Sequence, residues 1–343
     1  MKKVLLAIVL GFGLQIANAQ QTYVPDDNFE QALINLGYDT VLDDYVTTSS
    51  IDTVQQLLIE FLNIADLTGI EDFTVLLSLS CYGNQLTSLD VSQNIALDYL
   101  NCKINQLTNL DLSQNTALDY LNCGENNLTN LDVSNNIALT ELKCYVNILT
   151  SLDVTNNPFL TWLDFGGNDI SSIDLSQNTN LTDFGCVSNS LTILDLSNNI
   201  DLTSLGCSEN NLTNLDVSSN TSLKTLQCQD NQLIALDVRN GNNTNMIQFY
   251  HFMITNNPNL SCISVDDSTW SANNWISTQQ IDPQHYFSNI CNATTSIDEL
   301  GKEEKELLKV VNIIGEEVAV LKENQIYFYI YNDGTVVKQL NIK

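Results

Sequence analysis

The chain has 343 residues and a formal net charge of −29, from 41 Asp and Glu residues against 12 Lys and Arg residues. So acidic a chain is repelled by the phosphates of nucleic acids and by anionic lipid head groups, which argues against both as partners. Basic proteins, neutral glycans and divalent cations are compatible with this charge.

Residues 1–19 have the pattern of a secretory signal peptide. A pair of lysines begins the chain, an apolar run covers 4–14, and Ala17-Asn18-Ala19 supplies small residues for cleavage. The apolar run is too short to span a bilayer and no second long run follows it, so we expect no membrane insertion. The mature chain should begin near Gln20 and be secreted or held at the outer cell surface.

Residues 20–75 are predicted to form an N-terminal cap and a degenerate first repeat. The segment 24–34 has the acidic start and the apolar spacing of a capped helix. The segment 51–70 follows the repeat pattern of the next segment, except that Leu62 stands where the pattern has asparagine. A helix before this repeat would cover the open end of a stacked core.

Residues 76–237 repeat one 21-residue pattern eight times without an insertion, L-x-x-L-x-C-x-x-N-x-L-x-x-L-D. A fixed period of this length predicts a solenoid, because one unit cannot bury its apolar face without neighbours. Alternating apolar residues before the cysteine predict a short strand. The asparagine at position 9 falls where the chain must turn, so its amide should bond backbone groups of adjacent coils.

This pattern resembles the leucine-rich-repeat family, and the resemblance covers all eight units. It implies an α/β solenoid that is mostly β: a curved rod with a parallel β-sheet on its concave face and tight, mostly irregular turns on its convex face. Roughly ten rungs, each about 4.8 Å from the next, are expected.

Seven cysteines recur at position 6 of the repeat. A metal array or a ladder of disulfides would use them, but Phe165 fills the same position in the fifth repeat, so the position requires an apolar group rather than sulfur. A straight column cannot surround one tetrahedral zinc, and stacked Cβ atoms lie farther apart than a relaxed disulfide requires. We therefore expect buried thiols and no metal site. The seven are Cys81, Cys102, Cys123, Cys144, Cys186, Cys207 and Cys228.

Residues 238–296 are predicted to hold a last repeat and a C-terminal cap. The register is lost after Asp237, returns once at 257–265, and the segment as far as Cys291 closes the second end. Cys262 and Cys291 lie outside the cysteine column, in the cap of an exported chain, so we predict a disulfide between them.

An aspartate stands at position 15 of each repeat, and Ser or Thr follows it two residues later in all repeats but the last. Each carboxylate can accept hydrogen bonds from its own turn, or neighbouring carboxylates can share calcium. The dense Asp, Asn and Gly spacing of a dedicated calcium loop is missing, so we favour the first interpretation and expect no cofactor, with calcium as the alternative. This aspartate column comprises Asp90, Asp111, Asp132, Asp153, Asp174, Asp195, Asp216 and Asp237.

Positions 3 and 5 point outward on the predicted concave sheet and their residues vary, and position 7 flanks them. Aromatic side chains beside amides and a few charges suit protein hot spots or sugar stacking, although exposed aromatics can also simply pack across strands. Because Tyr99, Tyr120 and Trp162 cluster around the fourth repeat, we predict a site for a protein or glycan ligand. The candidate residues are Tyr82, Tyr99, Asn101, Lys103, Tyr120, Asn122, Glu141, Lys143, Tyr145, Trp162, Asp164 and Asp183.

Catalysis has little support in the sequence. The two histidines, His251 and His285, pair with no recognisable nucleophile, and no phosphate loop, zinc-protease motif or nucleophile elbow occurs. We predict that the chain is not an enzyme. A column of threonines could suggest an ice-binding surface, but one hydroxyl row beside a carboxylate row is poor support for it.

Residues 297–343 differ in composition, with nine acids and six lysines against 32 acids and four bases in 20–296. Strand-like runs broken by Gly315 and by Asn332-Asp333-Gly334 predict a small antiparallel module. With its aromatic strand Ile326–Tyr331 and Lys338 near the end, the tail resembles the C-terminal sorting signal of the type IX secretion system of Bacteroidetes. The resemblance implies a contact with the secretion machinery, passage across the outer membrane, removal of the tail, and release or surface attachment. A small structural cap is the alternative.

Two functional hypotheses follow. In the first, the chain is an exported binding protein whose concave face recognises a protein or glycan in adhesion or recognition. In the second, the rod is a structural surface or matrix component without a specific ligand, stabilised by calcium.

Overall fold

The computed structural model describes residues 19–246, 251–275, 280–291, 307–312, 317–318, 325–331 and 336–341. The chain divides into two compact units, Met1–Cys291 and Asn292–Lys343, which we describe separately. The predicted signal peptide lies outside the described residues except for Ala19. None of the helices in the described ranges is both long enough and apolar enough to cross a membrane.

A small cap begins the first unit. Its elements are β1 (Gln21–Tyr23), α1 (Asp27–Leu36), β2 (Tyr45–Thr47) and α2 (Thr48–Ile51), with β1 and β2 paired antiparallel. The Asp26 side chain caps α1 by accepting the backbone N–H groups of Asn28 and Phe29, and it also accepts those of Ala65 and Asp66. One carboxylate thus accepts the free N–H groups at the start of the helix and also links the helix to the first coil. The predicted helical cap is confirmed.

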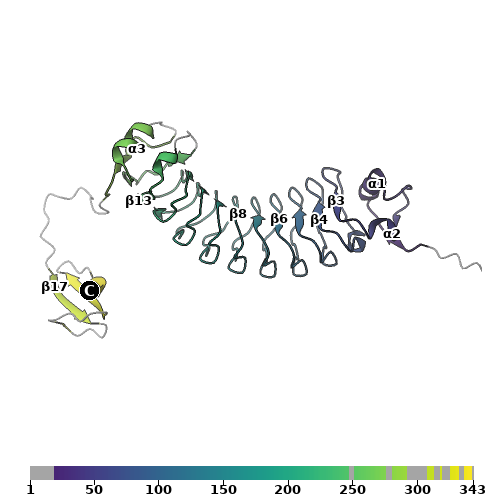
Figure 1. Ribbon diagram of the computed structural model, residues 1–343, viewed down its shortest axis with the longest axis horizontal. Helices are drawn as coiled ribbons and strands as arrows, with labels where there is room; N and C mark the ends of the chain where they lie inside the picture. The colour runs from purple at the N-terminus through teal and green to yellow at the C-terminus, as the bar shows by residue number, and fades with distance from the viewer. Residues whose placement is uncertain are drawn as a thin grey trace, which may run out of the picture. The chain divides into compact units, whose positions relative to one another are not determined.

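Ten short parallel strands form the main sheet of the solenoid, in the order β14-β12-β10-β9-β8-β7-β6-β5-β4-β3. The coils of this unit stack in a curved row (Figure 1). Each strand from β4 to β12 in this sheet occupies positions 3 to 5 of its repeat, as predicted, and adjacent strands pair in register, for example Leu100 with Leu121. The bounds are β3 (Gln56–Leu58), β4 (Ser78–Ser80), β5 (Tyr99–Asn101), β6 (Tyr120–Asn122), β7 (Glu141–Lys143), β8 (Trp162–Asp164), β9 (Asp183–Gly185), β10 (Ser204–Gly206), β12 (Thr225–Gln227) and β14 (Phe252–Met253).

The core is a stack of identical apolar layers. In the third repeat, Leu118, Leu121, Cys123, Leu128 and Val133 are all fully buried, and the other repeats bury the same positions. The seven column cysteines are free and buried, as predicted. Burial raises their pKa, to about 12 for Cys102 and for Cys207, because a thiolate loses its hydration there. They therefore act as small apolar side chains.

Two columns of asparagine side chains form hydrogen bonds with backbone groups in the turns of the coils. At position 9, Asn126 donates through Nδ2 to the carbonyls of Cys102, Cys123 and Gly124, and its Oδ1 accepts the N–H of Leu107 at 2.9 Å. The second column occupies position 19, and each of its amides donates to two carbonyls of the preceding coils. Its members, almost wholly buried, are Asn94, Asn115, Asn136, Asn157, Asn178, Asn199 and Asn220.

A second parallel sheet and a cap close the other end of the solenoid. The sheet has the order β11-β13-β15-β16, and the segment 257–265 does return to the repeat, because Asn257 takes the place of a position-9 asparagine. Trp275 is fully buried in the cap and stacks on Phe252, with ring centroids 3.8 Å apart. The remaining elements are η1 (Ile70–Asp72), β11 (Asn214–Asp216), β13 (Ala235–Asp237), η2 (Asn243–Asn245), β15 (Cys262–Ser264), α3 (Ser268–Asn274) and β16 (Tyr286–Ser288).

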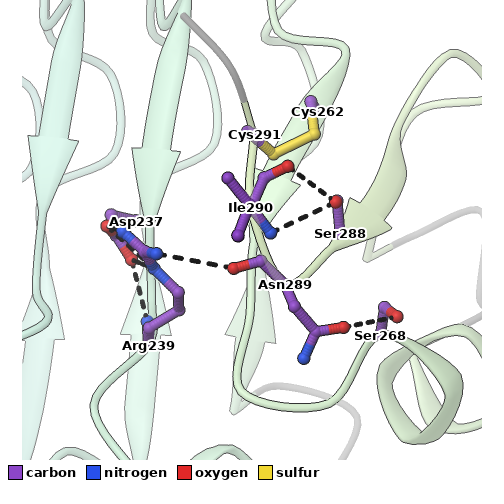
Figure 2. The surroundings of a disulfide bond; sticks show 8 residues. All are labelled: Asp237, Arg239, Cys262, Ser268, Ser288, Asn289, Ile290 and Cys291. Atoms are coloured by element: carbon purple, nitrogen blue, oxygen red, sulfur yellow. Dashed lines mark hydrogen bonds and ion pairs between the residues drawn. A yellow bond between two sulfur atoms is a disulfide. The ribbon is translucent and has the colours of Figure 1, made fainter.

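The predicted disulfide between Cys262 and Cys291 is present, with Cα atoms 5.8 Å apart (Figure 2). Beside it Arg239, the one arginine of the sequence, bonds the Asp237 carboxylate and donates to the Asn289 carbonyl at 3.4 Å. The disulfide thus ties the end of the cap to β15, and the hydrogen bond from Arg239 ties it to the last full repeat.

Replacing both cysteines of this disulfide with alanine should loosen the cap. The bridge spans 29 residues, and closing a loop of that length stabilises a fold by about 3–4 kcal/mol on the chain-entropy account. We expect the near-ultraviolet circular dichroism signal of the buried Trp275 to be lost at a lower temperature in the variant. A reductant should lower the melting temperature of the wild type and leave the variant unchanged; equal melting of both proteins would contradict the prediction.

The second unit contains a three-stranded antiparallel sheet with β18 in the middle. Its strands are β17 (Leu307–Asn312), β18 (Gln325–Tyr331) and β19 (Val336–Asn341). The aromatic strand expected at Ile326–Tyr331 lies within β18. Gly315 and the turn Asn332-Asp333-Gly334 lie outside the described residues.

Candidate functional site

The in-register pairing of the strands places all twelve candidate residues on one face. Because each position lies beside its equivalent in the next coil, positions 3, 5 and 7 form three parallel rows across the sheet. Tyr99, Tyr120, Glu141, Trp162 and Asp183 begin successive strands from β5 to β9. This face, on the concave side of the solenoid, is the candidate binding site.

The centre of the site is a column of stacked side chains. Tyr99 and Tyr120 lie nearly parallel with ring centroids 4.4 Å apart. On the other side of Tyr120, Lys143 places its Nζ 5.1 Å from the Tyr120 centroid and 3.8 Å from that of Trp162. Both faces of the Tyr120 ring are therefore covered, and a ligand can reach mainly its edge and hydroxyl group.

Lys143 is fixed by three neighbours. Besides the two rings, it makes an ion pair with Glu141, whose Oε2 lies 2.7 Å from Nζ, and its side chain keeps only 15% of its surface exposed. A cation held over Trp and Tyr faces is favourable by about 0.5–2 kcal/mol, which restricts the motion of the whole cluster. The site is thus preorganised at its centre.

Asp164 lies next to this cluster as a largely buried carboxylate. Desolvation raises its pKa, while the N–H of Gly166, at 3.0 Å from Oδ1, and the charge of Lys143 act in the opposite direction. Glycine in the next coil makes room for it, because a Cβ atom on Gly185 would lie 2.9 Å from Oδ1.

A second aromatic group lies toward the N-terminal end of the same face. Tyr82 has the Lys103 ammonium 5.3 Å from its centroid and contacts Phe61 edge-to-face at 4.7 Å. Phe61 was not among the candidate residues, and with 61% of its surface exposed it extends the site. Tyr145 lies over Gly124, where a Cβ atom would be 2.8 Å from its ring.

The two amides among the candidates are less available than the sequence suggested. Asn101 and Asn122 are buried, and their Oδ1 atoms accept the backbone N–H groups of Lys103 and Gly124. Their side chains complete the ends of β5 and β6, and little of their surface is exposed.

The aspartate column makes the predicted hydrogen bonds. Oδ1 of Asp132, for example, accepts the N–H of Ser134 at 2.9 Å, and the same bond recurs in every repeat, with Arg239 as the donor to Asp237. Among the described residues, no three His, Cys, Asp or Glu side chains gather in a metal-binding cluster. The hydrogen bonds to the backbone give each aspartate of the column a structural role in its own turn.

These bonds predict that the solenoid loses stability in acid. The N–H and hydroxyl groups of the following Ser or Thr lower the pKa of six of these aspartates, those from Asp90 to Asp195 in the column. A carboxyl with a lowered folded-state pKa stabilises the fold above its unfolded pKa of about 4, and this contribution disappears as the pH falls through the folded value.

We expect the urea midpoint to stay level from about pH 7 to pH 5 and to fall below about pH 4. Protonation also relieves repulsion between the stacked carboxylates, which acts in the opposite direction and weakens in high salt. A midpoint that rises on acidification would show that repulsion outweighs the hydrogen bonds.

The two histidines lie in different parts of the C-terminal end of the first unit. His285 is buried in the cap, where its Nδ1 accepts the N–H of Asp282 and its Nε2 lies 3.5 Å from Asp282 Oδ2. Burial lowers its pKa, so the ring is neutral near pH 7. His251 belongs to the last parallel coil, where its carbonyl accepts the N–H of Leu226.

The sequence matches no family model and no curated protein. Among solved structures, the functional domain of InlJ from Listeria monocytogenes, which includes a cysteine ladder, is 31% identical, over 78% of this chain and 70% of that chain, with a TM-score of 0.46. The internalin InlF of the same species is 18% identical over 79% and 96% of the two chains, with a TM-score of 0.53. Internalin C2, also from L. monocytogenes, is 20% identical over 72% and 98%, with a TM-score of 0.50. These neighbours are bacterial leucine-rich-repeat proteins, and the ten parallel strands described above together with the likeness to InlF show that this chain has the leucine-rich-repeat fold.

Proposed function

We propose that the chain is an exported binding protein that recognises a protein partner through the concave face of its solenoid, in adhesion or recognition. The observation that carries the proposal is the fixed column of Tyr99, Tyr120, Lys143 and Trp162. Large aromatic side chains and a desolvated cation on a rigid sheet are the groups that dominate protein–protein affinity.

The covered ring faces favour a protein over a glycan. Stacking on a sugar requires an open ring face, and Tyr120 has none, since Tyr99 and Lys143 occupy the two sides. Ring edges, tyrosine hydroxyls and the carboxylates of Glu141 and Asp164 suit the mixed polar and apolar surface of a folded protein.

The acidic charge of this chain further restricts the kind of protein that can be its partner. The segment 20–296 has 32 acids and four bases, and two of those bases, Lys103 and Lys143, already lie over rings of the site. A partner with a basic surface would be attracted over long distances, whereas an acidic one would be repelled.

Export belongs to the same proposal. Residues 1–19 would act as a cleaved leader, and residues 297–343 would be read by the type IX secretion machinery and removed. The antiparallel pairing of β18 with β17 and β19 supports this interpretation of the tail. Mass spectrometry of the secreted chain in a Bacteroidetes host, compared with a chain truncated after 296, would test it: the truncated chain should stay inside the cell.

The binding function is tested by screening the full chain against cell-surface proteins and glycans, with calcium and with a chelator. A variant with alanine at Tyr99, Tyr120 and Trp162 is compared with Phe159→Ala, which removes an exposed aromatic from a turn. Protein binding that is lost in the triple variant and kept in the control supports the proposal. Binding to glycans alone would show that the partner is a glycan and not a protein. No binding, with a melting temperature that falls in chelator, would favour the calcium-stabilised structural rod.

A further inference from the structure

Position 8 of the repeat has a left-handed backbone in every coil of the solenoid. The φ angles are 56° at Phe61, 53° at Ile104, 50° at Val146 and 54° at both Ser188 and Glu209. Glycine adopts this conformation without strain and occupies the position in two other coils, but bulky and β-branched residues are unfavourable in it. Phe61, Ile104 and Val146 are therefore in places where the local backbone does not favour them.

These three side chains are not core residues. Phe61 exposes 61% and Val146 53% of its surface, and Ile104 is only partly buried. Ile148, two residues beyond Val146, exposes 54%. More than half of the surface of Phe61 and of Val146 stays exposed, so packing within the chain compensates the backbone strain only in part, which is the pattern found where an exposed side chain serves a function.

The glycines of position 8 make room for the same side chains. A Cβ atom on Gly83 would lie 2.4 Å from the Phe61 ring, and one on Gly167 would lie 3.2 Å from Cγ2 of Val146. Phe61 and Val146 therefore lie along the edge of the sheet, each over the glycine of the next coil. Along position 8 the residues from the first coil onward are Phe61, Gly83, Ile104, Glu125, Val146 and Gly167.

This edge borders the candidate binding site directly. Phe61 contacts the ring of Tyr82, while Ile104 and Val146 follow Lys103 and Tyr145 in the sequence. Glu125 occupies position 8 between Ile104 and Val146 and is exposed, and the segment 20–296 is acidic as a whole, with 32 acids and four bases.

We propose that Phe61, Ile104, Val146 and Ile148 form an apolar rim strip that holds a segment of the partner protein in which apolar side chains alternate with lysine or arginine. The inference rests on the proposed function, because the strip continues the concave site. Apolar side chains would cover the strip, and the basic ones would meet Glu125 and the acidic surface beyond it.

Glycine substitution separates binding from stability at these positions. Ile104→Gly and Val146→Gly together release the left-handed strain, so the melting temperature should hold or rise, while apolar contact area is lost. Ser188→Gly and Glu209→Gly together form the matched control at the same backbone position outside the strip. Ile104→Asn with Val146→Asn gives a second variant, because asparagine tolerates this backbone and keeps a side chain of moderate size.

The probe is a display library of 15-residue peptides selected on the full chain, from which enriched peptides are synthesised and their dissociation constants measured. We expect sequences that combine apolar residues with lysine or arginine, bound at least about tenfold more weakly by both rim variants and unchanged by the control. Peptides that bind the rim variants within about threefold of the wild type, enrichment of acidic peptides, or no enrichment would overturn the proposal.

Trp162→Ala shows whether the concave face, the rim strip or both bind the peptides. Peptides that lose affinity for Trp162→Ala but not for the rim variants would leave the concave-face function in place and remove the rim strip. Peptides unaffected by either change would contradict both.

Discussion

Asn126→Leu should lower the free energy of unfolding of the solenoid by about 3–5 kcal/mol. The side chain makes four hydrogen bonds inside the coil stack, three to carbonyls and one from the N–H of Leu107. Leucine has the same number of side-chain heavy atoms and the same branching, so no large cavity forms. The N–H of Leu107 loses its partner, which costs about 1–3 kcal/mol, whereas the carbonyls of Cys102, Cys123 and Gly124 each keep one other donor. Loss of the three bonds to these carbonyls costs a further amount of about 0.5–1.5 kcal/mol each, and partial relaxation keeps the total below the simple sum.

Urea unfolding followed by far-ultraviolet circular dichroism measures this loss. Asn127→Leu is the matched control: the neighbouring side chain is exposed, and its replacement should change stability by about 0.5 kcal/mol or less. A loss below about 1 kcal/mol for Asn126→Leu would mean that water or a shifted turn replaces the amide.

Because the same buried side chains recur in every coil, the fold could be predicted from the sequence. A 21-residue period without insertions admits only a stack of equal coils, and the alternation before each cysteine places the strand at positions 3 to 5. Phe165 in the cysteine column identified that position as apolar, and the structure buries it completely. Both predictions are reliable because the pattern is repeated eight times, so that a substitution in one repeat does not obscure the position of the strand or of the core.

The second asparagine column and the role of Phe61 became clear only from the three-dimensional structure. The asparagine column at position 19 is as regular in the sequence as the one at position 9, yet it lies beyond the 15-residue motif used to define the repeat. Phe61 precedes Leu62 in the first coil, where the missing asparagine hid the register. Its left-handed φ and its contact with Tyr82 arise only from the stacked backbone.

Within the site, the sequence identified the face but not the contacts. Alternation placed Asn101 and Lys143 alike on the outward side, but the first is buried against its own strand end while the second lies between two rings. Such differences depend on side-chain torsions and on the residue in the next coil, which periodicity does not specify.

Trp162→Ala should weaken binding of the protein partner by about 30- to 1000-fold, which corresponds to about 2–4 kcal/mol. Trp162 exposes 42% of its surface, so the substitution removes little core packing and should change stability by about 1 kcal/mol or less. The loss should exceed that of any other single alanine on this face, because Trp162 combines a large apolar surface with the fixed Lys143 cation at 3.8 Å.

Lys143→Met tests whether that cation organises the site. Methionine keeps the apolar stem but leaves Glu141 without its ion pair, so binding should weaken and its dependence on salt should change, whereas Lys143→Arg should keep most of the affinity. Phe159→Ala, an exposed aromatic in a turn, should leave the dissociation constant unchanged. If Trp162→Ala and Phe159→Ala had equal effects in a titration calorimetry experiment, the concave face would not be the interface, because Phe159 lies in a turn outside that face.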